Sequence, residues 1–158
     1  MVTQTINIGT SLNHSEAANL IAHAFKPPAI HSDDLDVYIT TKFIPAMRKM
    51  FEQHGYERME KAQAQTDSEI IVSVNGTIYE IGDDYSWVRD KAGIYALGSG
   101  GHIALGALHA LLPEGKLTLA EAKRICTRAI EIAAGLDPYT ALPLRVYTQR
   151  QVKEKGIE

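Results

Sequence analysis

The chain has 158 residues, of which 45% are hydrophobic, and this is enough for one domain with its own core. Its formal net charge is -3 at pH 7, and its Lys and Arg residues are scattered, which argues against a nucleic-acid or anionic membrane partner. No apolar run reaches the roughly 18 residues of a membrane-spanning helix, and the N-terminus has no signal-peptide pattern. We therefore expect a cytoplasmic protein.

The chain begins with the pattern of a strand followed by a helix. Residues Thr5 to Ile8 alternate in polarity like a strand and run into Gly9-Thr10-Ser11. Helical spacing follows from Ser15 to Phe25, and Lys26-Pro27-Pro28 ends this helix.

A second helix is predicted to begin at Ser32-Asp33-Asp34, which supplies a cap and an acidic first turn. Pro45 is expected to kink it, and Gly55 to close it. The charged, Gln-rich stretch 57–67 is interpreted as a solvated connection. The apolar face of this helix consists of Leu35, Ile39, Phe43, Met47, Met50 and Phe51.

A β-hairpin is predicted in the middle of the chain. Ile70, Val72 and Val74 alternate with polar residues up to Asn75-Gly76, which is the strongest short-range hairpin signal. Ile78 and Ile81 mark the returning strand, and residues 85–88 form one more short strand.

The stretch from Ile94 to Leu112 is expected to place a strand, a glycine turn and a helix in immediate succession. The strand covers Ile94 to Leu97, and the turn is Gly98-Ser99-Gly100-Gly101. Because glycines permit close approach and the turn opens a helix, its amides could face an anion or a polarised carbonyl. A tight turn in a core is the alternative interpretation.

The last helix begins at a capping box of Thr118 with Glu121, and a final strand follows from Leu144 to Tyr147. The tail 149–158 is charged. The apolar face of the helix consists of Leu119, Ala122, Ile125, Ala129, Ile132 and Ala133.

The sequence does not indicate a metal site or a disulfide bond. The single cysteine, Cys126, excludes an internal disulfide and is expected to be a buried structural thiol. His102 and His109 share a helix, but no carboxylate or cysteine completes a ligand set near them. We expect neither a metal nor a cofactor.

The order of elements indicates an α+β fold over residues 1–148, with 149–158 as a tail. The run Ala96-Leu97-Gly98-Ser99-Gly100-Gly101, its Ala-rich helix and a capped helix ending Ile130-Glu-Ile-Ala-Ala-Gly-Leu-Asp137 together resemble the second half of a proteasome β-type subunit. The chain is most similar to bacterial and phage proteasome-like N-terminal nucleophile hydrolases. The resemblance covers residues 5–148 and implies an αββα sandwich of two antiparallel sheets between helical layers, truncated at the N-terminus.

The resemblance also implies roles for individual residues. In this family the nucleophile is the hydroxyl of an N-terminal threonine, and its α-amine, with a pKa near 8, assists proton transfer. Ser99 matches the serine beside that amine, while Asp137 and Thr140, spaced Asp-x-x-Thr, match the residues that complete its hydrogen-bond network. Gly9 matches the glycine whose amide forms the oxyanion hole, worth about 3 kcal/mol in the transition state.

The family's segment that carries the threonine, an aspartate and a lysine is absent from the sequence as given. Thr3 could become an N-terminus only after loss of Met1 and Val2, and no Asp and Lys follow it at usable spacing. We therefore expect a proteasome-like subunit that is not catalytic as given and acts through self-assembly, as a ring or a dimer.

The alternative is a threonine-type peptidase whose nucleophilic segment comes from a longer reading frame or a partner chain. An ATPase is a further partner that the resemblance implies.

Overall fold

The computed structural model describes residues 6–12, 15–56, 58–60, 63–65, 68–89 and 91–149. The chain forms two compact units. Unit 1 contains residues 1–89 together with 149–158, and unit 2 contains residues 90–148. Within the described residues, no helix is long and apolar enough to cross a membrane. Whether residues 1–148 behave as one domain stays a prediction.

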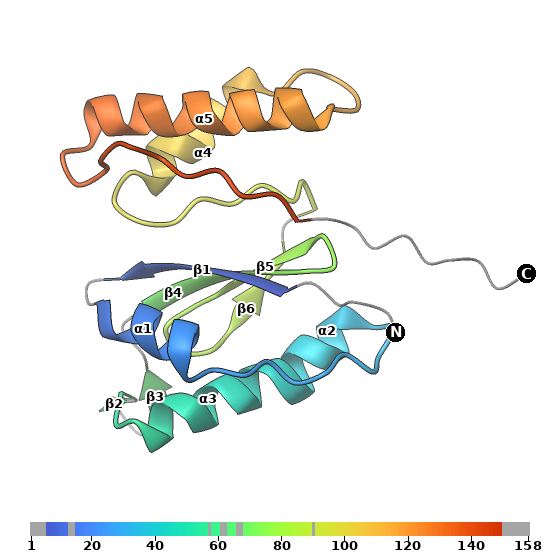
Figure 1. Ribbon diagram of the computed structural model, residues 1–158, viewed down its shortest axis with the longest axis vertical. Helices are drawn as coiled ribbons and strands as arrows, with labels where there is room; N and C mark the ends of the chain where they lie inside the picture. Colours follow the sequence, from blue (N-terminus) through green and yellow to red (C-terminus); the bar gives the residue numbers. More distant parts are fainter. Residues whose placement is uncertain are drawn as a thin grey trace, which may run out of the picture. The chain divides into compact units, whose positions relative to one another are not determined.

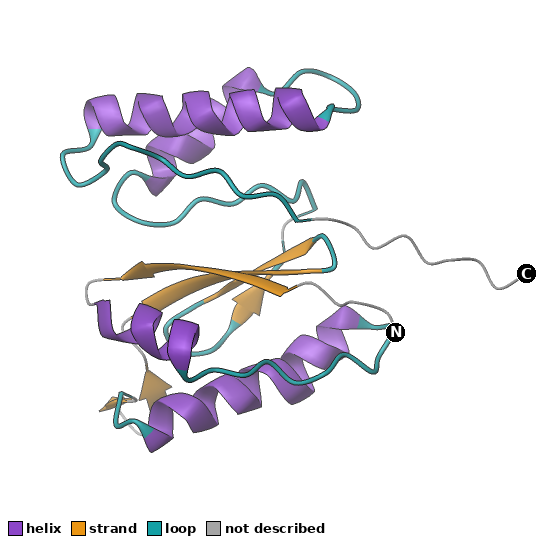
Figure 2. Cartoon of the chain, in the orientation of Figure 1, coloured by secondary structure: helices purple, strands orange, loops and turns teal. Residues whose placement is uncertain are grey.

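Unit 1 contains an antiparallel sheet with the strand order β1-β4-β5-β6 in its described part (Figures 1 and 2). The strands are β1 (Ile6–Leu12), β4 (Ser68–Val74), β5 (Thr77–Ile81) and β6 (Trp87–Val88). The predicted hairpin at Asn75-Gly76 is confirmed, with Val72 opposite Tyr79.

Strand β1 is longer than the sequence predicted. The predicted strand pattern covered Thr5 to Ile8, but the strand continues through Gly9-Thr10-Ser11 to Leu12, and Gly9 lies opposite Ile71 of β4. Pairing with β4 extends the strand beyond the alternating residues, because strand formation depends on context.

Two helical segments of unit 1 correspond to the two helices predicted in the first part of the chain. The first is α1 (Ser15–His23). The longer segment is α2 (Leu35–Tyr38), the π-helical turn η1 (Ile39–Phe43) and α3 (Ile44–Gln53). The predicted cap is confirmed, since the Asp34 carboxylate accepts from the backbone N–H groups of Asp36 and Val37 at 3.0 and 3.3 Å.

A π-helical turn, η1, precedes Pro45, where we predicted a kink. Pro45 has no N–H, and its ring would collide with the carbonyl of the residue four positions earlier in a regular helix. The backbone instead widens ahead of it, and the Ile44 N–H donates to the carbonyl of Ile39, five residues back.

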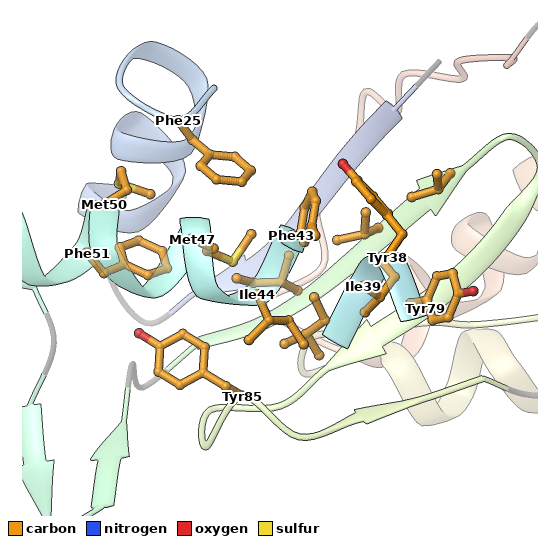
Figure 3. Close-up of a cluster of buried hydrophobic side chains, with 14 of the residues drawn as sticks. Phe25, Tyr38, Ile39, Phe43, Ile44, Met47, Met50, Phe51, Tyr79 and Tyr85 are labelled. Carbon is orange, nitrogen blue, oxygen red and sulfur yellow. The ribbon is translucent and has the colours of Figure 1, made fainter. Parts of the chain in front are cut away.

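The helices pack on the sheet of unit 1 through a core of aromatic and aliphatic side chains (Figure 3). Phe25 and Phe43 meet edge to face with ring centroids 5.2 Å apart, and Tyr79 meets Trp87 in the same way at 5.3 Å. The predicted helix face is largely buried, and the side chains with no more than 1% exposure include Tyr38, Ile39, Phe43, Met47, Phe51, Ile70, Val72, Val74, Tyr79 and Ile81.

The stretch predicted as a connection contains a small ribbon instead. Strand β2 (Arg58–Glu60) pairs antiparallel with β3 (Gln63–Gln65). The sequence of these strands is mostly polar, so it lacks the apolar alternation by which strands are recognised.

Unit 2 is built from two helices, α4 (Gly101–Leu111) and α5 (Leu119–Leu136), which pack on each other. The predicted capping box of α5 is confirmed, since Thr118 Oγ1 accepts from the Glu121 N–H and the Glu121 carboxylate accepts from the Thr118 N–H. The prediction for Cys126 was wrong, because this thiol is exposed.

Two predicted strands of unit 2 do not form. Ile94 to Leu97 and Leu144 to Tyr147 are drawn as loops in Figure 2 and belong to no described strand. A strand requires a ladder partner, and apolar alternation alone does not supply one. The mixed helix and strand composition is confirmed, whereas the second sheet of a sandwich is not present among the described residues.

Candidate functional site

The glycine turn before α4 places Ser99 at the surface of unit 2. Gly98 has φ 91°, a conformation that side chains with a Cβ rarely adopt. The Gly101 N–H donates to the Gly98 carbonyl at 2.9 Å, which closes the turn and starts the helix. The side chain of Ser99, between these glycines, is exposed.

Asp137 lies at the same end of unit 2's helical pair, directly after α5. Its N–H donates to the Ala133 carbonyl at 2.8 Å, so its backbone closes the last turn of α5. The Thr140 N–H in turn donates to the Asp137 carbonyl at 3.2 Å. This local turn brings the side chain of Thr140 next to the carboxylate of Asp137.

The three residues meet at one carboxylate oxygen. The hydroxyls of Ser99 and Thr140 each donate to Asp137 Oδ2 at 2.5 Å. We call Ser99, Asp137 and Thr140 the Asp137 cluster. Asp137 is only 8% exposed, whereas Ser99 is exposed and Thr140 half-buried, so the hydroxyl side of the cluster is open to solvent.

Hydrogen bonding holds Asp137 in its ionised form. Hydrogen bonds from two hydroxyls lower the pKa of Asp137 below its ordinary value, and the bond from Ser99 has a larger effect than the bond from Thr140. Burial acts in the opposite direction. A carboxylate stabilised in this way is a poor proton acceptor at neutral pH and a good partner for a cation.

Gly100 permits this arrangement in a way that the sequence analysis did not anticipate. A Cβ at this position would overlap Thr140 Oγ1 and would lie 3.2 Å from Asp137 Oδ2. The absence of a side chain therefore lets Thr140 and Asp137 approach the Ser99 turn. The sequence shows the glycine, but the contact that it permits comes from a segment far along the chain, beyond the end of α5.

Two further residues were predicted at the site, Gly9 and Thr3. Gly9 is in β1 of unit 1, next to Ile8, which lines an open apolar pocket of about 340 Å³. The other lining residues are Ala18, Ile21, Ala22, Phe25 and Pro27. Thr3 lies outside the described residues.

The described residues do not gather three or more His, Cys, Asp or Glu side chains in a group that could hold a metal ion. The Asp137 cluster has one carboxylate and two hydroxyls. Its chemistry is therefore that of a hydrogen-bonding site for a charged or polar group.

Solved structures provide the comparison that identifies the fold. BPH, a bacterial proteasome homologue from Thiobacillus denitrificans, matches over 94% of this chain and 77% of its own, with a TM-score of 0.69 and 16% identity. The same protein in complex with epoxomicin matches over 96% of this chain and 78% of its own, with the same TM-score and identity. HslV from Trypanosoma brucei matches over 86% of this chain and 71% of its own, with a TM-score of 0.53 and 21% identity.

No protein-family model matches the sequence, and a search of curated proteins finds no relative. The likeness is therefore one of fold. This chain has the fold of proteasome-like N-terminal nucleophile hydrolases, as the glycine turn and the order of elements had indicated.

Proposed function

We propose that this chain is a proteasome-like subunit that acts through self-assembly and that, as given, does not supply its own threonine nucleophile. The observation that carries the proposal is a run of exposed apolar side chains that begins at Leu136, the last residue of α5, and continues in the segment after it. Leu136 is 70% exposed, Tyr139 86% and Tyr147 78%, and Leu142 and Val146 between them are also exposed. So many large apolar groups within twelve positions are typical of an interaction surface.

The Asp137 cluster does not supply a nucleophile of its own. Both hydroxyls donate to the carboxylate, and the lowered pKa of Asp137 leaves it a weak base near neutral pH. Neither Ser99 nor Thr140 is therefore activated as a nucleophile by this carboxylate. The cluster is suited to hold a donor group and not to attack a carbonyl.

The native mass of the purified chain at micromolar concentration tests self-assembly. We expect a discrete oligomer, and we expect the pair of substitutions Tyr139→Ser and Leu142→Ser to shift it toward monomer. Leu119→Ser is the matched control, because Leu119 is also an exposed apolar residue of unit 2 but lies at the start of α5. A monodisperse monomer of the unsubstituted chain would contradict the proposal.

A second candidate function is that of a threonine-type peptidase completed by a nucleophilic segment from a longer frame or a partner chain. The intact Asp137 cluster favours it. An ammonium group has three donors, and the cluster offers an ionised carboxylate beside two hydroxyl oxygens that can still accept hydrogen bonds. The α-amine of a supplied threonine is a fitting occupant.

Unit 1 offers a place for a peptide in this second candidate. Strand β1 is at the edge of the described sheet, and the apolar pocket beside Ile8 adjoins the strand that carries Gly9. An extended peptide can pair with such an edge and place an apolar side chain in a neighbouring pocket.

Intact mass after incubation with epoxomicin separates the two candidates. The chain alone should show no adduct. The chain made from a longer frame, or together with a partner that supplies the threonine, should gain one adduct, and Asp137→Asn should reduce its yield. An adduct on the chain alone, at an N-terminus beginning at Thr3, would overturn the non-catalytic proposal. An ATPase partner is part of either candidate and would be sought by copurification.

A further inference from the structure

A second pocket of unit 1 has no part in the proposed function. It is an open cavity of about 410 Å³ between the loop that precedes α2 and the helical segment α2 to η1. The loop contributes Pro28, Ala29, His31 and Ser32, and the helical segment contributes Val37, Tyr38, Thr41 and Lys42. The volume is within the range of small-molecule sites, which starts at about 300 Å³.

A part-buried hydrogen bond joins the two walls of this pocket. The Tyr38 hydroxyl donates to the Pro28 carbonyl at 2.7 Å, and Tyr38 is only 1% exposed. This bond ties the loop wall to the helical wall. The pocket is therefore formed before any ligand arrives, which lowers the entropic cost of binding.

The helical wall includes the π-helical turn η1, an irregularity found frequently at functional sites. Thr41 and Lys42 belong to this turn, and the Thr41 hydroxyl donates back to the Val37 carbonyl at 2.8 Å. Val37 itself is 48% exposed, which is unusual for a large apolar residue on a helix that packs on a core. The helical wall therefore offers apolar surface to a ligand in the cavity.

The lining contains one lysine and no carboxylate. Its two ionisable groups besides the Tyr38 phenol are those of Lys42 and His31, and both residues are exposed. Asp33 and Asp34 are close in sequence but do not line the cavity, and the Asp34 carboxylate is occupied by the first N–H groups of α2. A ligand with an apolar body and one negative charge matches this lining.

We propose that this pocket binds a small apolar carboxylate, with its hydrocarbon part against Val37 and Ala29 and its carboxylate at Lys42. The inference goes beyond the proposed function, because it concerns neither the Asp137 cluster nor the exposed run after α5. The ion pair supplies orientation, and the apolar walls supply most of the affinity.

Titration of the full chain with octanoate, followed through the backbone amide signals of residues 28–42, tests this proposal. We expect saturable shifts at the lining residues, and an affinity at least tenfold lower for octanamide, which has the same chain without the charge. Lys42→Met should weaken octanoate binding about tenfold. Lys49→Met is the matched control, because Lys49 is an exposed lysine of α3 outside the lining, and it should leave binding unchanged.

Ala29→Trp provides a second variant that fills the cavity and should abolish the shifts while the remaining amide spectrum stays native. Equal affinity for octanoate and octanamide, equal effects of the two lysine substitutions, or unchanged binding to Ala29→Trp would each overturn the proposal. Shifts spread over the whole surface without saturation would overturn it as well.

Discussion

The Ser99 hydroxyl lies 2.5 Å from the carboxylate of Asp137, although 38 residues separate them. This bond joins the turn that starts α4 to the residue that ends α5. The two helices of unit 2 are therefore held together by a polar contact at one end, in addition to their packing. The contact has consequences for acid stability and for substitutions in the turn.

Acid should weaken unit 2 through Asp137. Its pKa is lower in the folded chain than in the unfolded chain, so the folded state keeps the carboxylate ionised at pH values where the unfolded state has taken up a proton. The stabilisation is complete above the ordinary pKa of an aspartate, about 4. It is lost as the pH falls through the lowered value.

Thermal unfolding of the chain and of Asp137→Asn at several pH values measures this contribution. We expect the wild-type advantage to be largest near pH 6 and to shrink toward pH 2.5. Glu114→Gln, which removes an exposed carboxylate of the same unit, is the control and should show no such trend. A wild-type advantage that does not change with pH would exclude Asp137 as the titrating group.

Alanine at position 100 should disturb the Asp137 cluster. The backbone of Gly100, with φ -82° and ψ 1°, is accessible to alanine, so any cost must come from contact. The added Cβ would overlap Thr140 Oγ1, and we expect a loss of about 1 to 3 kcal/mol in the free energy of unfolding.

Gly106→Ala is the matched control, because Gly106 is in the same helix and a Cβ added there would meet no neighbouring atom, so alanine should stabilise by up to about 1 kcal/mol. Thr140→Ala should recover part of the loss in the double variant, since it removes the overlapping oxygen. Strictly additive costs in urea unfolding would show that the overlap is not the cause.

The candidate site was predictable only in part. The grouping of Ser99, Asp137 and Thr140 was inferred from a resemblance, and the structure brings these three side chains together. Their proposed role beside an amine stays a prediction. The contact made possible by Gly100 could not be read from the sequence, because it depends on where Thr140 lies in space.

Phenylalanine at position 79 should destabilise unit 1. The buried Tyr79 hydroxyl donates to Asp36 Oδ1 at 2.7 Å, and Arg89 pairs with the same oxygen at 3.0 Å. A hydrogen bond to a charged group contributes about 1.5 kcal/mol, and this is the loss we expect at pH 7. Tyr139→Phe, at an exposed phenol, should have no effect.

The same substitution should reduce sensitivity to alkali. The pKa of Tyr79 is raised well above its ordinary value, mainly by burial and to a smaller extent by the hydrogen bond to Asp36. The unfolded chain loses this proton above about pH 10 while the folded chain keeps it, so stability falls as the pH rises. Between pH 7 and pH 10.5, the melting temperature of Tyr79→Phe should decrease less than that of the wild type. An equal fall would argue against this linkage.

Local signals explain which elements were predicted correctly. The turn at Asn75-Gly76 and the caps at Asp34 and Thr118 act within a few residues of where they occur, and each formed as expected. The segments 94–97 and 144–147 have strand-like apolar patterns but no ladder in the described structure. A strand depends on a partner that the local sequence does not specify.

Gln149 should anchor the end of the described chain to the hairpin of unit 1. Its amide oxygen accepts from the Gly76 N–H at 2.7 Å and from the Ser73 hydroxyl at 2.9 Å, and its amide nitrogen donates to the Ser73 carbonyl at 3.1 Å. Gln149→Ala removes all three bonds, and we expect a loss of about 1 to 2 kcal/mol because part of their strength is replaced by water. Hydrogen exchange of the Gly76 amide should become faster in this variant.

Gln53→Ala is the control, because Gln53 is an exposed glutamine at the end of α3. If the Gly76 amide of Gln149→Ala exchanged as slowly as in the wild type, the hydrogen bonds of Gln149 would not persist in solution.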